Sequence, residues 1–277
     1  CRRDILRCGA SVGCSTSRLP SVSLRCCWFL HPEIEAVFVV HNESSTGVLN
    51  DIEAISAVRG DHEALLVVDT VSSLGGTPVK MDEWKLDVVV SASQKCLMAP
   101  PGVAFFSVSS RAREKMLQCQ SSRYYFDLRK YESFMEKGET PFTPNISNVY
   151  ALGEALSIIE AEGLEKVFAR HRLMRDMIRA GVEGLGLELL VEDQFASPTV
   201  TAVKLDDANS FRETIRNQFG MELGGGQGPH TDRIFRVGHM GYATPLDMLT
   251  VLAVLEMAFE KFGAATTAGE LVMSQKN

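Results

Sequence analysis

The feature that most constrains the fold is a series of short apolar segments, rich in valine, in which apolar and polar residues do not alternate. They cover residues 35–41, 64–69, 86–91 and 102–108. Strands with one solvated face alternate, whereas uninterrupted runs are typical of parallel strands covered on both faces. Residues 49–59, between the first two runs, have helical spacing. The pattern predicts an α/β domain with a mostly parallel sheet and helices on both faces.

The second half of the sequence has a different pattern, dominated by helices. Residues 147–162 and 164–185 have apolar positions three and four apart, with Gly163 between the two segments. Thr244 and Pro245 are a typical N-cap and first helical residue, and they predict a last long helix that runs to about residue 262. Between these helices we expect strands at 199–205 and 234–237, a helix around 211–219 and a glycine loop at 224–228, and after residue 263 a tail. We therefore predict a partial large domain at 33–161 and a smaller α+β domain at 162–277.

The first 32 residues differ from the rest of the chain. They hold five arginines, five serines and one acidic residue, which gives them a net charge of +4 and leaves −11 for the remainder. We interpret residues 1–32 as a leader outside the domain. Three hypotheses stay open: an organellar transit peptide, a disordered tail, and a translated intron or wrong exon. The absence of an initial methionine favours the third.

Composition excludes several classes of protein. A net charge of −7 argues against a nucleic-acid-binding protein, and no run approaches the roughly 20 apolar residues of a membrane span. Five of the seven cysteines lie in the first 27 residues, no C-x-x-C pair occurs, and no histidines have metal-ligand spacing. We expect a protein of a reducing, intracellular compartment without a metal site. Peroxisome, mitochondrion and cytoplasm stay open, and the ending SQKN lacks the S-K-L signal.

Polar groups follow three of the predicted strands, at residues 41–46, 69–73 and 91–95. Carboxyl ends of parallel strands meet at one edge of the sheet, where ligands bind. Asp69 and Lys95 at this edge suit a Schiff-base cofactor: the amine bonds to an aldehyde, and the carboxylate keeps a pyridine nitrogen protonated. From spacing alone, a plain Asp–Lys ion pair is an open alternative.

Three longer motifs add a family resemblance. They are VVDTVSSLGGTPVKMDEWKLDVVVSASQKCLMAPPG at 67–102, HNESSTGV at 41–48 and IFRVGHMGY at 234–242. Together they resemble the class V branch of the fold-type I pyridoxal-phosphate enzymes, and most closely the alanine–glyoxylate and serine–glyoxylate aminotransferases. The resemblance covers about residues 32 to 262. It implies the fold-type I large domain, here partial, with the smaller C-terminal domain.

The resemblance also implies a role for individual residues around the cofactor ring. Lys95 corresponds to the lysine that bonds pyridoxal phosphate, and Asp69 to the partner of the pyridine nitrogen. Val71 corresponds to the apolar floor under the ring. Ser44 corresponds to a contact with the phenolic edge of the cofactor or with the substrate.

Further positions correspond to ligands of the phosphate and of the substrate. Gln94 and Ser93 are similar to phosphate ligands, and Arg236 to the arginine that binds the substrate carboxylate, for which a planar guanidinium is suited. The segment TPFTP at 140–144 is similar to a strip that reaches the partner's phosphate across a dimer interface, with Thr143 as the contact. The resemblance therefore implies a homodimer.

The implied activity is transfer of an amino group from alanine or serine to glyoxylate or a similar 2-oxo acid, with no nucleic-acid or membrane partner. The family's glycine-rich phosphate loop and ring-stacking aromatic residue, which precede HNESSTGV, are not recognisable in residues 1–30. Two hypotheses stay open: an active aminotransferase with an incomplete sequence, and a truncated, non-catalytic remnant. A cysteine desulfurase is disfavoured, because that branch has a histidine where this sequence has Gln94 and another where it has the run at 70–73.

Overall fold

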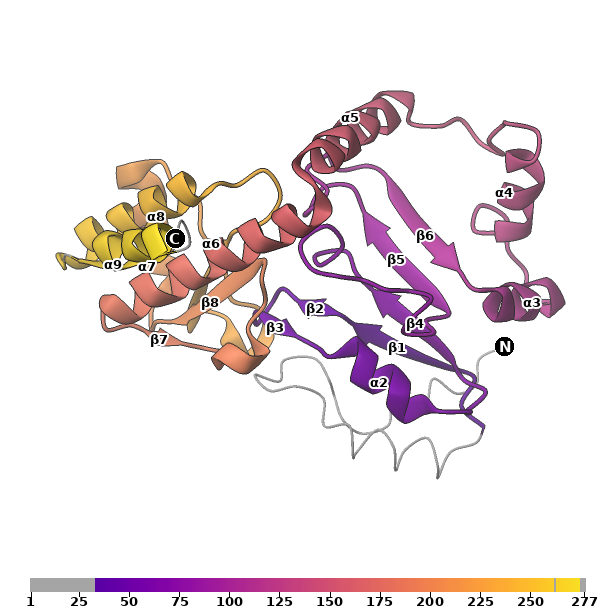
Figure 1. Cartoon of the computed structure of the whole chain (residues 1–277), viewed down its shortest axis with the longest axis horizontal. Coiled ribbons are helices and arrows are strands. Elements are labelled where there is room, and N and C mark those ends of the chain that lie inside the picture. Colours follow the sequence, from indigo (N-terminus) through magenta and orange to yellow (C-terminus); the bar gives the residue numbers. More distant parts are fainter. Residues whose placement is uncertain (1–32, 262, 275–277) are drawn as a thin grey trace.

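The computed structural model describes residues 33–261 and 263–274, and these form two lobes joined by a long helix (Figure 1). The large lobe contains the N-terminal strands, and the small lobe contains the C-terminal helices. The predicted leader at 1–32 lies outside the described residues. The division at residues 161 and 162 stays a prediction.

The large lobe is built on a four-stranded sheet of order β1-β4-β5-β6. β1 (Ala36–Val40), β4 (Leu65–Asp69) and β5 (Val88–Ala92) are parallel, and β6 (Ala104–Val108) runs antiparallel to β5. The arrowheads of the parallel strands point toward the small lobe (Figure 1). A mostly parallel sheet was predicted and is confirmed, and its carboxyl edge faces the other lobe.

One face of this sheet is covered by α2 (Ile52–Arg59), which begins where the Asp51 carboxylate caps the amide of Ala54. Its apolar residues pack on alternate strand residues in a core of Val39, Ile52, Ile55, Leu66, Val68, Leu86 and Val89. On the opposite face Phe38 is 72% exposed and Phe106 46% exposed. Within residues 33–261 and 263–274, these two aromatic side chains are left uncovered, whereas the predicted α/β class is confirmed.

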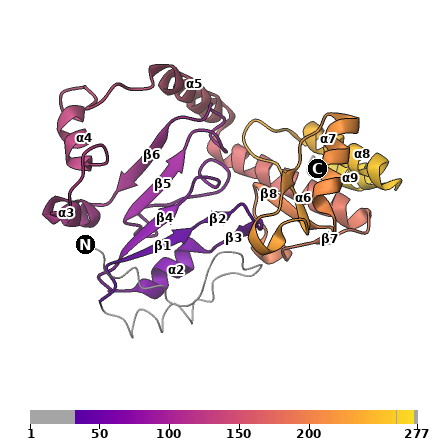
Figure 2. The same cartoon turned by 180° about the vertical axis from the view of Figure 1, so that it is seen from behind.

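After β6 the chain leaves the sheet and forms an arm. Residues 112–117 predict a helix from the sequence and lie in α3 (Ser110–Gln118), whereas α4 (Leu128–Met135) was not predicted. α4 buries none of its residues, although Leu128, Tyr131 and Met135 have the spacing of one helix face. The arm returns through α5 (Ile146–Glu162), and the views from both sides show α3 and α4 at the end of the molecule opposite the small lobe (Figures 1 and 2).

α6 (Leu164–Gly184) crosses from the large lobe into the small lobe, where its apolar face meets a second sheet. This sheet has the order β7-β8-β10-β9, from β7 (Glu188–Leu189), β8 (Val200–Lys204), β10 (Ile234–Gly238) and β9 (Gly224–Gly225). α7 (Ala208–Phe219) and α8 (Pro245–Phe259) complete the predicted α+β layer. Thr244 caps α8 and exchanges hydrogen bonds with Asp247, as a capping box does.

The predicted tail after residue 263 is wrong, because α9 (Ala264–Ser274) is a helix. Ala268 is fully buried in the core formed with α6 and α8. Local sequence does not predict this helix; tertiary packing stabilises it. No helix in the described part of the chain has the length and apolar character that a membrane span needs.

Candidate functional site

The polar ends of β1, β4 and β5 lie side by side, as the strand pattern predicted. The amide of His41 donates to the carbonyl of Asp69 at 2.8 Å, and the amide of Thr70 donates to the carbonyl of Val90 at 2.8 Å. These bonds continue the strand pairing beyond the strands themselves. The segments that follow β1, β4 and β5 therefore lie together at one edge of the sheet.

Asp69 is the last residue of β4 and is exposed, and its carboxylate accepts a hydrogen bond from the amide of Val71 at 2.8 Å. Val71 is half-buried, and Thr70 between them is fully buried. Lys95 lies in the turn that follows β5 and is half-buried. Within residues 33–261 and 263–274 no hydrogen bond engages the Lys95 amine, so a ligand can bond to it.

A buried polar junction lies behind Asp69 and is centred on Ser72. Its hydroxyl donates to the Asn42 carbonyl at 3.0 Å and accepts from the Asn42 side-chain amide at 2.8 Å and from the Ser44 hydroxyl at 2.7 Å. The Thr199 hydroxyl, from the small lobe, donates to the Ser72 carbonyl at 3.1 Å. The junction therefore connects the loops after β1 and β4 to each other and to the other lobe.

Ser72, Asn42 and Thr199 were not predicted as site residues from the sequence. The available signal was the position of Asn42 and Ser72 just beyond apolar strands, where a buried polar residue needs a partner. Asn42 still has one unsatisfied group, because its side-chain oxygen is buried without a hydrogen-bond partner in the described part of the chain. Such an acceptor is a natural point for a ligand donor.

Arg236 on β10 brings the small lobe into the site. Its Nη1 donates to the Ser44 carbonyl at 2.6 Å, and its Nε donates to the Gly225 carbonyl at 2.8 Å. Burial, together with the nearby charge of Arg212, holds the pKa of Arg236 below its usual value, and Glu43 opposes this shift. Arginine stays charged at such a site. Two carbonyls thus orient the guanidinium, and within the described residues Nη2 has no partner, which leaves it for an anion.

The two predicted phosphate ligands beside the lysine differ in their surroundings. The Ser93 hydroxyl is fully buried and donates to the Pro100 carbonyl at 2.7 Å, so it stabilises the turn around the lysine. Gln94 is exposed, and its side chain makes no hydrogen bond within the described residues. Of the two, Gln94 is the side chain that can still reach a phosphate, and both assignments stay predictions.

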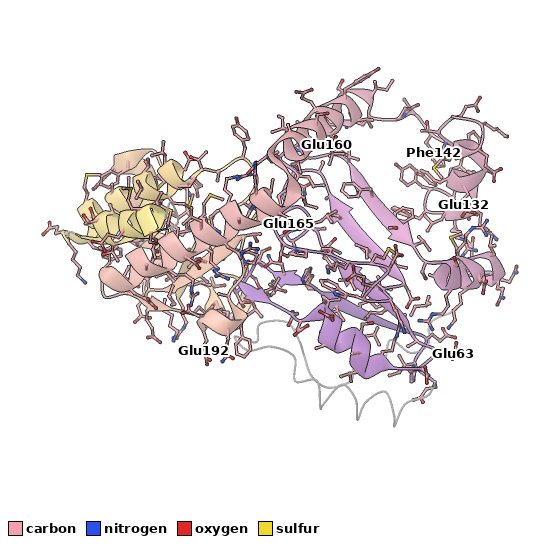
Figure 3. All side chains as sticks on the ribbon, viewed as in Figure 1. Glu63, Glu132, Phe142, Glu160, Glu165 and Glu192 are labelled. Carbon is pink, nitrogen blue, oxygen red and sulfur yellow. The ribbon has the colours of Figure 1, made fainter. Side chains whose placement is uncertain are left out.

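Thr143 is not brought together with the other predicted residues. It is exposed, in the segment that joins α4 to α5. Phe142, its neighbour, lies beside α4, far from the small lobe that contributes Arg236 (Figure 3). Thr143 is therefore not brought to Lys95 within this chain, and its assignment stays a prediction.

The residues present fit the cofactor that the resemblance implies. A lysine amine and a carboxylate end neighbouring strands, and the nearby Asn42 oxygen is buried without a partner among the described residues. His41 is also buried at this edge, and burial lowers its pKa to about 4, with a smaller opposing effect from Asp51, so the imidazole is neutral at physiological pH. This set suits an aldehyde-bearing pyridine ring with polar substituents.

Comparison with known proteins identifies what the chain is similar to. The family model described as aminotransferase class-V matches residues 23–227. A soluble hydrogenase small subunit of Synechococcus sp. is 43% identical over 232 residues, which are 83% of this chain and 60% of that protein. Serine–glyoxylate aminotransferase of Arabidopsis thaliana is 36% identical over 243 residues, which are 85% of this chain and 61% of that protein.

Solved structures agree with this similarity. The crystal structure of pyridoxamine–pyruvate aminotransferase from Mesorhizobium loti superposes with a TM-score of 0.88 at 32% identity, over 93% of this chain and 70% of that one. The chain therefore spans about three-fifths of the length of these two sequence relatives and 70% of the chain in the crystal structure.

Proposed function

Because this chain belongs to the class V aminotransferases, we propose that it moves an amino group from a small amino acid, alanine or serine, to glyoxylate or a similar 2-oxo acid. The observation that carries the proposal is the hydrogen bond between Arg236 and the Ser44 carbonyl, which joins residues 192 positions apart. It brings a carboxylate-binding guanidinium from the small lobe to the sheet edge that holds Lys95 and Asp69. Both substrates of a transamination between amino acids carry a carboxylate.

The proposed cofactor is pyridoxal 5'-phosphate. When bound, it supplies an aldehyde that takes up the amino group and a ring that accepts electrons from the substrate carbon. Lys95 would hold the aldehyde, Asp69 would hold a proton on the pyridine nitrogen, and Val71 would support the ring. Gln94 would bind the phosphate, with Ser93 as the second assignment and Thr143 contributing from a partner subunit.

Each residue then has a task in the reaction. The Lys95 amine, released when the substrate amine takes its place on the aldehyde carbon, would take a proton from the substrate carbon and give it to that former aldehyde carbon, as a general base and then a general acid. Arg236 holds the substrate carboxylate with two parallel charge-assisted bonds, first for the donor and then for the 2-oxo acid. Ser44, whose carbonyl accepts from Arg236 and whose hydroxyl donates to Ser72, would contact the same substrate or the phenolic edge of the cofactor.

The relatives' names support a small 2-oxo acid as the acceptor. They include serine–glyoxylate aminotransferases, an L-aspartate–glyoxylate aminotransferase of Paracoccus denitrificans and a pyridoxamine–pyruvate transaminase. These proteins share glyoxylate or pyruvate as the acceptor named. We therefore propose glyoxylate as the first acceptor to test, with serine and alanine as donors.

A homodimer is part of the proposal. The arm around α3 and α4 carries Tyr124, Tyr125 and Phe126, which are 72%, 55% and 80% exposed. Tyr125 stacks on Phe142, with ring centroids 4.8 Å apart, beside Thr143. An exposed aromatic cluster of this kind is typical of an interface core. It would bring Thr143 to the partner's cofactor.

The first experiment is covalent labelling of Lys95. Purified chain is mixed with pyridoxal phosphate, the visible absorbance is recorded, borohydride is added, and the labelled peptide is mapped. We expect a visible band and label on Lys95 in the wild type and in the control Lys80→Ala, and neither in Lys95→Ala. Lys80 is a suitable control because it is exposed and paired with Glu83.

Turnover of serine or alanine with glyoxylate follows in the same protein. Loss of the Lys95 proton transfer is expected to lower the rate by about 10²- to 10⁴-fold. Folded wild-type protein without label on Lys95 would contradict the proposal and favour a non-catalytic remnant.

A further inference from the structure

The backbone of Lys95 is held from the small lobe by the turn that follows β10. Gly241 in this turn has a φ of +74°, and a Cβ at that position would lie 3.1 Å from the Lys95 carbonyl oxygen. Only a glycine fits so close an approach without strain. The position of the lysine turn therefore depends on the position of residues 240–243.

His171 on α6 holds the amide side of this turn. Its Nε2 accepts a hydrogen bond from the Gly241 amide at 3.2 Å, and its Nδ1 donates to the Val167 carbonyl at 2.8 Å. The side chain is fully buried, and burial holds its pKa below the usual value. The ring is therefore neutral, with its proton on Nδ1 and its acceptor facing the turn.

Arg170, the preceding residue, holds the carbonyl side. Its Nη1 donates to the Gly241 carbonyl at 2.9 Å and to the Ala243 carbonyl at 2.7 Å. Its Nε and Nη2 bind the two carboxylate oxygens of Glu162 at 2.7 and 2.9 Å. Glu162 ends α5 at the elbow between α5 and α6, which Glu160 and Glu165 flank in Figure 3. Glu162 thus fixes the Nε and Nη2 side of the guanidinium, while Nη1 binds the turn.

A second contact involves the residue after the lysine. A Cβ on Gly76, in the loop after β4, would lie 2.8 Å from the Cys96 sulfur and 3.5 Å from the His171 ring. Cys96 is buried, and its sulfur contacts the Ser72 carbonyl at 3.5 Å. His171 therefore packs against the loop that contains Gly76 as well as against the turn that contains Gly241.

We propose that His171 and Arg170 are positioning residues for Lys95, which hold the turn at 240–243 against the lysine backbone so that the amine meets the cofactor aldehyde. The inference rests on the proposed function for the role of Lys95, whereas the contacts themselves do not. Neither residue is proposed to touch substrate or cofactor. Both act through Gly241.

The test compares His171→Phe with His171→Gln. Phenylalanine keeps the ring and removes the acceptor, whereas the glutamine side-chain oxygen can still accept from the Gly241 amide. We expect His171→Phe to raise hydrogen exchange about tenfold in residues 240–243 and in the peptide containing Lys95, and to weaken pyridoxal phosphate binding about five- to tenfold, as loss of a buried bond implies. His171→Gln is expected to restore most of both. Arg170→Lys, which keeps the charge, is expected to give a smaller shift in the same direction.

Arg179→Gln is the matched control for general weakening of α6. Arg179 also lies buried on α6 and donates to a carbonyl, that of Val191, in a different part of the small lobe. It should leave exchange near Lys95 and cofactor affinity unchanged. Equal effects of Arg179→Gln and His171→Phe would overturn the inference. So would faster hydrogen exchange in residues 240–243 of His171→Phe with no change in hydrogen exchange at Lys95 or in affinity for pyridoxal phosphate.

Failure of the proposed function is distinguishable from failure of the inference. If folded wild-type chain takes no label on Lys95, the proposed function fails. Hydrogen exchange without cofactor still shows whether His171 holds the lysine turn.

Discussion

At the scale of single residues, the proposed substrate site depends on a guanidinium that two backbone carbonyls already orient. Arg236 donates from two different nitrogens to two backbone carbonyls, those of Ser44 and Gly225. Backbone acceptors on two separate loops fix the plane of the group. Preorganised donors of this kind bind a carboxylate with little loss of side-chain freedom.

Arg236→Lys is predicted to raise the KM for both the amino acid and the 2-oxo acid by about 10- to 100-fold, because an ammonium cannot form the two parallel bonds. The visible band of the bound cofactor should stay unchanged. Steady-state kinetics with serine and glyoxylate measure the effect, and exposed Arg233→Lys on the same segment is the control. An unchanged KM in Arg236→Lys would remove this residue from the substrate site.

At the scale of elements, two helical glycines of one chain have opposite surroundings. Gly181 in α6 lies against α8, where a Cβ would be 2.4 Å from a methyl group of Leu252. Among the described residues, no atom other than the adjoining backbone of α5 lies within 4 Å of the same position at Gly153. Helix packing therefore requires a glycine at the first site but not at the second.

Gly181→Ala is predicted to lower the free energy of unfolding by about 1–3 kcal/mol, because overpacking outweighs the better helix propensity of alanine. Gly153→Ala is predicted to raise it by up to about 1 kcal/mol. Urea unfolding of both variants beside the wild type measures the difference. Equal changes in the two variants would show that the approach of α6 to α8 is not tight.

At the scale of the whole molecule, buried neutral histidines determine how the chain responds to acid. Burial lowers the pKa of His239 to about 3 and that of His41 to about 4, and it lowers that of His171 as well. The Nδ1 of His239 donates to the Pro198 carbonyl, and its Nε2 accepts from the Thr201 hydroxyl, so both ring nitrogens have partners inside the fold. In the unfolded chain each would titrate near 6.5.

As the pH falls below about 6.5, these histidines therefore take up protons in the unfolded state before they do so in the folded state. The free energy of unfolding is predicted to fall between pH 6.5 and 4, by up to about 1.4 kcal/mol per pH unit for each such histidine. Urea unfolding at a series of pH values measures the slope. His239→Gln should reduce the slope by the contribution of one histidine, and an unchanged slope would mean that His239 is already protonated in the fold.

Much of the large lobe was predictable because its elements are encoded locally. The valine runs that became β1, β4 and β5 follow from residue spacing, and parallel strands must bring their carboxyl ends to one edge. Asp69 and Lys95 could therefore be placed at a common edge without a structure. The cap of α8 at Thr244 is equally local.

Tertiary structure decided the contacts between distant segments. The approach of Arg236 to Ser44, the junction of Ser72 with Asn42 and Thr199, and the hydrogen bond between His171 and Gly241 each join separate lobes or loops, and no local spacing encodes them.

The helix α9 likewise forms because Ala268 packs on a core that the rest of the small lobe supplies. The sequence by itself thus determined the longer strands, most helices and the chemical groups at the sheet edge, but not the two-residue strands β7 and β9. Only long-range packing decided which groups meet, because burial energy depends on the surfaces that the whole fold brings together.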